Sequence, residues 1–243
     1  MGITDFGSPN PKQNHLLAAL PDADFQRLQE HLELVPMKLG ESVYESGRSM
    51  QYVYFPTNSI VSLLSVTKSG ATTETAAVGN EGMVGVGLVM GDEILPGPTL
   101  IRSSGYAYRL RDSVIKNEFK QCESMQSLLL RYTQTLLAQM AQNAACNRHH
   151  SIEQQLCRCL LSSLDRLQTN ELSMTQEFIA GLLGVRRESV TEAARKLQSA
   201  GLIHYSRGHI TVTNRAGLEA SVCECYSVLR KTFDTMRVER IAA

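Results

Sequence analysis

The residues best suited to binding a polyanion are concentrated between positions 186 and 215. Six basic side chains fall there: Arg186, Arg187, Arg195, Lys196, Arg207 and Arg215. Only two acidic residues, Glu188 and Glu192, accompany them, although the whole chain of 243 residues has 24 residues of each charge. A local basic patch on a neutral protein is typical of a nucleic-acid-binding face, and a solvated helix face is the alternative interpretation.

The surrounding sequence predicts two short helices and a hairpin. Ser173 and Gln176 fit a capping box at the start of the first helix, and Gly184 permits a left-handed turn after it. The second helix is expected to bury Val190, Ala194 and Leu197. Two apolar runs on either side of Arg207-Gly208 then predict a β-hairpin. This order is that of a winged helix-turn-helix, whose second helix enters the major groove of DNA.

At these residues the chain resembles the Crp/Fnr family of transcription regulators. The match is strongest in Thr175–Val212: the Thr-Gln-Glu opening, the Gly-Val-x-Arg-Glu-Ser-Val segment and the Leu-Gln-x-x-Gly-Leu-Ile exit are all similar to the family. The resemblance extends over nearly the full length. It implies a sequence-specific DNA-binding regulator, not an enzyme, that recognises an inverted-repeat operator as a homodimer. RNA polymerase is a further candidate partner.

By that resemblance, the base-reading positions are Arg186, Arg187, Glu188, Thr191 and Glu192. Arginine can donate two hydrogen bonds to guanine O6 and N7, and a carboxylate can accept one from cytosine N4. Contacts to the DNA phosphates, which set register without reading sequence, are expected from Thr175, Gln176, Ser189, Arg195, Arg207 and His209. The family often has a second arginine where this chain has Glu192, so the operator preference is expected to differ.

Upstream of this module, residues 33–110 consist of short β-rich runs separated by glycine and proline turns such as Pro96-Gly97-Pro98. The runs are Ser42–Glu45, Tyr52–Phe55, Ser59–Val66, Thr72–Val78, Thr99–Arg102 and Ala107–Leu110. They predict a β-barrel or jelly roll, preceded by short helices over Asn14–Leu20 and Ala23–Leu32, the second capped from Asp22-Ala-Asp24. The expected fold class is α+β. It comprises a sensor domain over residues 1–150 and a winged helix-turn-helix domain over residues 151–243.

A long helix should join the two domains. Met125, Leu129, Tyr132, Leu136 and Met140 recur at helical spacing, and neither proline nor glycine occurs from Glu123 to His150. Because a helix of this length usually packs lengthwise against a partner, we expect residues 123–150 to be a dimerisation helix with Leu129 and Leu136 in the interface. A core helix lying across the barrel is the alternative. A further helix is predicted from Ser151 to Leu167.

The sensor domain offers a candidate effector pocket at Glu81, Gly82, Gly85 and Thr99. Family members that bind cyclic nucleotides use a Gly-Glu pair for the ribose and a downstream arginine for the phosphate, and Glu81 matches the first of these. No Lys or Arg lies from Gly82 to Ile101, whereas a bound phosphate needs a cation or a ring of backbone donors. We therefore expect no control by cyclic AMP and leave the effector open; the alternative is that the glycines only shape turns.

The six cysteines are Cys122, Cys146, Cys157, Cys159, Cys223 and Cys225. Both Cys-x-Cys pairs are predicted to lie in helices, where side chains two residues apart point roughly 200° from each other and cannot easily share a metal. We expect buried, reduced thiols and no metal or cofactor. One alternative function is a metal- or redox-sensing regulator that uses Cys146, Cys157, Cys159 and the nearby His149-His150 pair. A second is a cyclic-nucleotide-binding module serving an enzyme.

Other function classes lack support in the sequence. The apolar runs are too short to span a bilayer, and the polar segment Met1–Pro11 has no secretory pattern, so we expect a cytoplasmic protein without a membrane partner. No phosphate loop, zinc-hydrolase motif or Gly-x-Ser-x-Gly elbow occurs. The sequence therefore favours a regulator over an enzyme.

Overall fold

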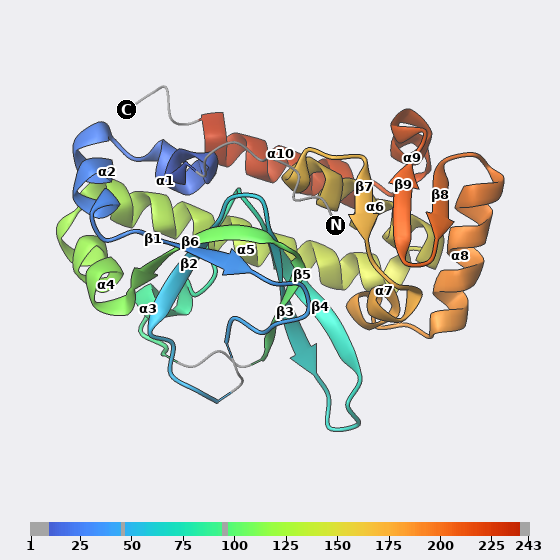
Figure 1. Ribbon diagram of the computed structural model, residues 1–243, viewed down its shortest axis with the longest axis horizontal. Helices are drawn as coiled ribbons and strands as arrows, with labels where there is room; N and C mark the ends of the chain where they lie inside the picture. Colours follow the sequence, from blue (N-terminus) through green and yellow to red (C-terminus); the bar gives the residue numbers. More distant parts are fainter. Residues whose placement is uncertain (1–9, 45–46, 94–96, 239–243) are drawn as a thin grey trace.

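The computed structural model describes residues 10–44, 47–93 and 97–238. Most of the segment Met1–Pro11, together with Glu45 and Pro96, lies outside the described residues. Figure 1 shows strands β1–β6 gathered at one end of the molecule and β7–β9 at the other, with the helices α5 and α10 running along both. The expected succession of a β-rich unit, a long helix and a second, smaller unit is confirmed.

The first unit is built from two antiparallel three-stranded sheets. Strands β1 (Glu33–Met37), β6 (Gly105–Arg111) and β2 (Tyr52–Pro56) form one sheet in that order, and β4 (Thr72–Val78), β3 (Ile60–Val66) and β5 (Thr99–Ser103) form the other. Buried residues of both sheets, including Phe55 and Val61, share a single core. Pro36 is tolerated because β1 is an edge strand. The jelly-roll-like α+β fold class is thus confirmed.

The expected strand at Ser42–Glu45 is wrong over its described part. Residues 42–44 form no strand; the side chain of Thr99 instead accepts hydrogen bonds from the backbone amides of Val43 and Tyr44 at 3.1 and 2.8 Å. A strand not separately expected, β1, supplies the outer edge. The first helices, α1 (His15–Ala19) and α2 (Asp22–Gln29), fall near their expected positions, but Asp22 is the first residue of α2 and Pro21 holds the N-cap position.

The helix α5 spans Glu123–His149, and its apolar stripe faces the core of its own chain. Leu129 and Leu136 are buried there with Tyr132, so the expectation that they form a dimer interface is wrong. The helix packs against β4 and against α4 (Asp112–Gln121). The opposite face carries Leu130 and Leu137, which are 55% and 54% exposed and one heptad apart.

The second unit has its own core. It contains α6 (Ile152–Leu167), β7 (Glu171–Ser173), α7 (Gln176–Leu183), α8 (Arg187–Ser199), β8 (Ile203–Ser206), β9 (His209–Val212) and α9 (Arg215–Ser221). A capping box between Ser151 and Gln154 opens α6, which matches the helix expected from Ser151 to Leu167. The sheet order is β7-β9-β8.

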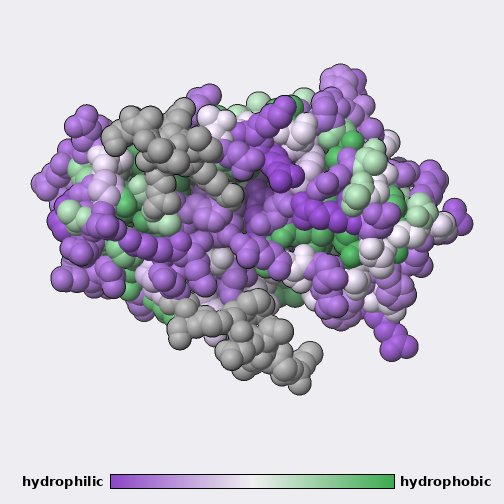
Figure 2. Space-filling model, turned by 90° about the horizontal axis from the view of Figure 1, so that it is seen from above, coloured by the Kyte–Doolittle hydropathy of each residue, from purple (hydrophilic) through white to green (hydrophobic). Residues whose placement is uncertain are grey.

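The last helix, α10 (Cys225–Val238), crosses back to the first unit. It packs along α5, and Phe233 and Met236 join the core of the barrel. The face of the molecule seen from the side of α10 is mostly hydrophilic (Figure 2). None of the helices in the described part of the chain is long and apolar enough to cross a membrane.

Candidate nucleic-acid interface

The helices α7 and α8 are joined as the sequence predicts, but the first helix starts later. Thr175 caps α7, because its hydroxyl accepts a hydrogen bond from the backbone amide of Phe178 at 3.1 Å. The expected Ser173–Gln176 capping box is therefore wrong: Ser173 is held in β7, where it pairs with His209 of β9. Gly184 ends α7 with a φ of 67°, and a side chain there would also collide with the hydroxyl of Thr73.

The helix α8 buries one face and exposes the other. Val190, Ala194 and Leu197 are buried as expected, together with Ala193. The exposed residues include most of the predicted base-reading and phosphate-binding set: Arg186, Arg187, Glu188, Thr191, Glu192 and Arg195. Ser189 is half-buried. In Figure 1, α8 lies at the outer edge of the molecule, away from the barrel.

A side-chain hydrogen bond joins α8 to α7. The hydroxyl of Thr191 donates to Gln176 Oε1 at 2.7 Å and also lies 3.0 Å from the backbone oxygen of Arg187. Two residues expected to touch DNA thus also hold the two helices at a set angle. This contact leaves the side chains of Arg186 and Arg187 exposed at the start of α8.

The hairpin β8–β9 forms the wing. Arg207 and Gly208 have φ values of 49° and 81°, as required at both central positions of a type I′ turn. The tip lies beside the start of α7, because the backbone amide of Met174 donates to the oxygen of Gly208 at 2.8 Å. Burial raises the pKa of Tyr205 in β8, and the positive charge of Arg187 acts in the opposite direction. The structure therefore brings Thr175, Arg207 and His209 near one another and places Arg187 near the wing.

The candidate effector residues are not brought together. Among them only Glu81 borders a cavity of about 240 Å³, which lies where the barrel, α5, α6 and α10 meet. A side chain at Gly82 would overlap the ring of Tyr132, and one at Gly85 would approach the hydroxyl of Tyr44 at 2.7 Å. The hydroxyl oxygen of Thr99 accepts hydrogen bonds from the backbone amides of Val43 and Tyr44. Gly82, Gly85 and Thr99 therefore shape the barrel.

Cations from outside residues 82–101 line the cavity. Arg166 of α6 donates to Glu81 Oε1 at 2.7 Å, and both side chains are buried. Arg102 in β5 pairs with Glu74 at 2.9 Å. Burial acts to lower the pKa of Arg102, but Glu74 together with Cys159 and Glu81 outweighs it, and the pKa is raised. The expectation that no cation lies near Glu81 is wrong. Arg166 supplies one from α6, which lies far along the chain from residues 82–101.

The cysteines divide into separate groups. Cys157 and Cys159 both lie on α6 in the second core, and burial raises the pKa of Cys157 to about 12. Cys223, however, precedes α10, so the premise that both Cys-x-Cys pairs lie in helices is wrong. Because the chain bends before α10, Cys223 and Cys225 meet Cys146 and His150 at the end of α5. His149 is exposed and does not join them. The expectation that Cys223 and Cys225 lie in one helix hid this grouping.

The chain consists, in order, of a jelly-roll-like unit, a long helix and a winged helix-turn-helix. Residues 154–221 match the Crp-like helix-turn-helix domain. The chain thus contains a domain of this family and has the fold of Crp/Fnr regulators, as the sequence resemblance implies. No curated protein sequence matches it.

Solved structures of this family resemble the chain over most of its length. A putative Crp/Fnr-family transcriptional regulator of Eubacterium rectale is 18% identical, with a TM-score of 0.67 covering 86% of this chain and 98% of that one. For a CRP-family transcriptional regulator of Thermus thermophilus the values are 16%, 0.64, 77% and 95%. For the c-di-GMP responsive global regulator CLP of Xanthomonas campestris they are 16%, 0.60, 79% and 99%.

Proposed function

We propose that this chain is a sequence-specific DNA-binding transcription regulator that recognises an inverted-repeat operator as a homodimer. The observation that carries the proposal is the start of α8, where Arg186, Arg187 and Glu188 are exposed on a helix anchored by a buried apolar face. Such a helix can enter the major groove while the wing and the start of α7 contact the phosphates. In this proposal residues 1–150 sense and dimerise, and residues 151–243 bind DNA.

The exposed face of α5 is the proposed dimer contact. Leu130 and Leu137 are one heptad apart and exposed in the single chain, and Ala144 continues the same spacing. Two parallel copies of this helix would bury these leucines against each other. The two copies of α8 would then be related by a twofold axis, which an inverted-repeat operator requires.

Selection of binding sites from a random duplex library tests the proposal. The full-length wild-type protein should select an inverted repeat with half-site centres about 10–10.5 bp, or a multiple of this, apart. Arg187→Ala should cost about 1–3 kcal/mol per half-site and relax the preference at one guanine. Lys68→Ala, which removes an exposed cation of the first unit, is the control and should select the wild-type sequence. An unchanged motif for Arg187→Ala would show that α8 does not read the bases.

A further inference from the structure

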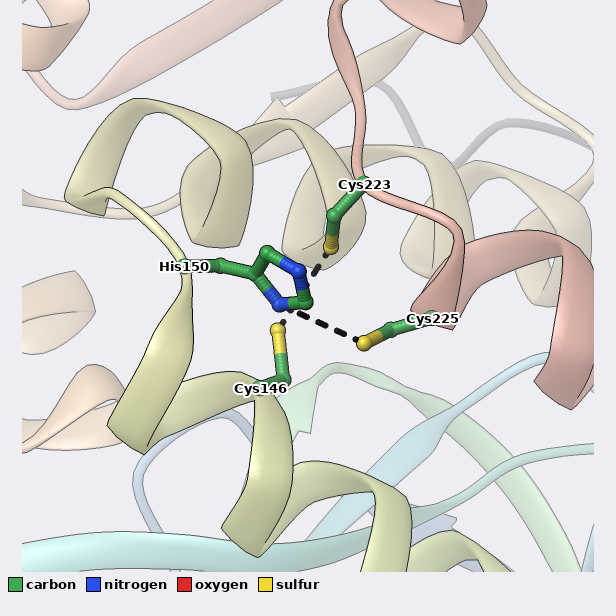
Figure 3. Close-up of side chains that lie close together, drawn as sticks. All are labelled: Cys146, His150, Cys223 and Cys225. Carbon is green, nitrogen blue, oxygen red and sulfur yellow. Dashed lines mark hydrogen bonds between the residues drawn. The ribbon is translucent and has the colours of Figure 1, made fainter.

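We propose that Cys146, His150, Cys223 and Cys225 bind one zinc(II) ion that fastens the start of α10 to the end of α5. The site does not depend on the proposed DNA binding. Figure 3 shows the four side chains pointing toward one another, with the imidazole of His150 close to the sulfur atoms. Their candidate ligand atoms all lie within 4.8 Å of one another.

The spacing of these atoms fits a tetrahedral zinc site. The sulfur atoms of Cys146 and Cys223 are 3.6 Å apart, and the sulfur of Cys225 lies 3.5 Å from His150 Nδ1. Tetrahedral zinc with Zn–S bonds of about 2.3 Å and a Zn–N bond of about 2.0 Å would set sulfur atoms about 3.8 Å apart and sulfur and nitrogen about 3.5 Å apart. An ion can therefore be accommodated with small shifts of the side chains.

The ligand chemistry selects the metal and the kind of site. Three thiolates and one imidazole are soft and borderline ligands, which favour zinc over magnesium or calcium. Four protein ligands fill a tetrahedral shell and leave no position for substrate. Such closed Cys3His sites are structural rather than catalytic.

Neighbouring groups orient the ligands as expected around a metal. His150 Nε2 lies 3.2 Å from the carboxylate of Glu224, which leaves Nδ1 facing the sulfur atoms. When Nε2 donates its hydrogen to Glu224, the lone pair of Nδ1 is available to the ion, as in carboxylate–histidine–zinc arrangements. The amide of Gln142 donates to the sulfur of Cys225 at 3.0 Å, a contact that stabilises a thiolate.

The position of the site indicates that the ion would join two segments of the chain. Its ligands come from two segments separated by about 75 residues, the end of α5 and the chain leading into α10. From there α10 runs back along α5, where it lines the cavity and contributes Met236 to the first core. Zinc would thus hold α10 in place against α5 and α6, because the ion binds the first residue of α10.

The primary test is the metal content of the full-length protein, purified under reducing conditions without chelator. We expect about one zinc per chain by elemental analysis. Replacement with cobalt(II) should give the visible bands and sulfur-to-cobalt charge-transfer absorption of a tetrahedral thiolate site. These measurements use the wild-type protein, so they do not depend on whether a variant folds.

Variants test the assignment of the ligands. Cys223→Ala and Cys225→Ala should lose the zinc, whereas Cys157→Ala, which removes a buried thiol outside the site, should retain it. Glu224→Gln changes an exposed side chain and should lower zinc affinity by about tenfold while the fold persists.

Several outcomes would overturn the proposal. Wild-type protein that takes up no zinc after reduction and incubation with the ion would do so, as would retention of full zinc affinity by both cysteine variants. A Cys146–Cys223 disulfide in a protein that binds no zinc when reduced would make the group a redox pair instead. Absorption typical of an iron–sulfur cluster would replace the zinc assignment.

Discussion

Arg187 and Arg207 are both exposed arginines, but they belong to elements that would meet DNA differently. Arg187 lies in the first turn of α8, and Arg207 occupies the left-handed turn of the wing. A wing tip reaches the phosphates, so its charge contributes to affinity without reading bases. This difference separates their predicted effects.

Arg207→Ala is predicted to weaken binding to all DNA sequences alike. Removing one phosphate contact should reduce the slope of log affinity against log salt by about one. Fluorescence anisotropy with the operator and with a scrambled duplex, over a series of salt concentrations, measures both effects. A change in the ratio of the two affinities would place Arg207 at the bases instead.

Glu188→Ala is predicted to relax the preference at one cytosine with little loss of affinity. The carboxylate can accept a hydrogen bond from cytosine N4, but it also repels the phosphates, so the two consequences of its removal oppose each other. Competition binding with operators substituted one base pair at a time checks this. Glu171→Ala, an exposed carboxylate in β7, serves as the control and should leave every preference unchanged.

At the scale of elements, the long helix shows what periodicity can and cannot predict. The absence of proline and glycine predicts α5 within one residue of its observed end. Periodicity could not assign its faces to partners, since leucines occupy both the core side (Leu129, Leu136) and the solvent side (Leu130, Leu137). The wide apolar stripe that contains Leu129 and Leu136 packs against the core of its own chain. The narrower pair Leu130 and Leu137, one heptad apart, stays exposed and is available to a second chain.

The double variant Leu130→Glu/Leu137→Glu is predicted to be a folded monomer with weak operator binding. Charges at these exposed positions should separate two copies of α5 while leaving the core intact. Analytical ultracentrifugation and circular dichroism measure assembly and fold. Leu39→Glu, an exposed leucine far from α5 in the sequence, should remain dimeric. A double variant that stays dimeric would locate the interface elsewhere.

Local sequence patterns also do not reveal contacts with distant segments, and this explains two further differences between prediction and structure. Both Ser173 and Thr175 can cap a helix, and only the pairing of Ser173 with a strand 36 residues later decides between them. Likewise, neither glycine nor proline marks the bend before Cys225, so the sequence predicts a helix through Cys223. Local patterns predicted the winged helix-turn-helix because its turn residues, Gly184 and Gly208, are local signals.

At the scale of the whole molecule, the cavity depends on contacts between distant segments. Glu81 follows the barrel strand β4, whereas Arg166 lies on a helix of the second unit, 85 residues away. The glycine-rich stretch after Glu81 therefore gives no indication of this cation. The spacing of Arg158 and Arg166 on one face of a largely buried helix is the signal that could have indicated it.

The Glu81–Arg166 pair is predicted to couple the barrel to the second unit. Arg166→Met should destabilise the protein by about 3–5 kcal/mol, because it leaves the Glu81 carboxylate buried and uncompensated. Adding Glu81→Gln should recover part of that loss. Chemical denaturation of the two single variants and the double variant measures the coupling; additive effects would mean that the pair contributes no interaction energy.

The same pair bears on the effector. A cyclic nucleotide held as in the family would need Glu81 for its ribose and a cation for its phosphate. Here Glu81 is bonded to Arg166 at 2.7 Å and Arg102 to Glu74 at 2.9 Å, so entry would require breaking buried ion pairs. We therefore predict that cyclic AMP gives no saturable heat in calorimetry and no tighter DNA binding. Saturable binding at micromolar concentration, lost in Glu81→Gln and accompanied by tighter operator binding, would contradict this prediction, because the nucleotide would then displace Arg166 from the carboxylate.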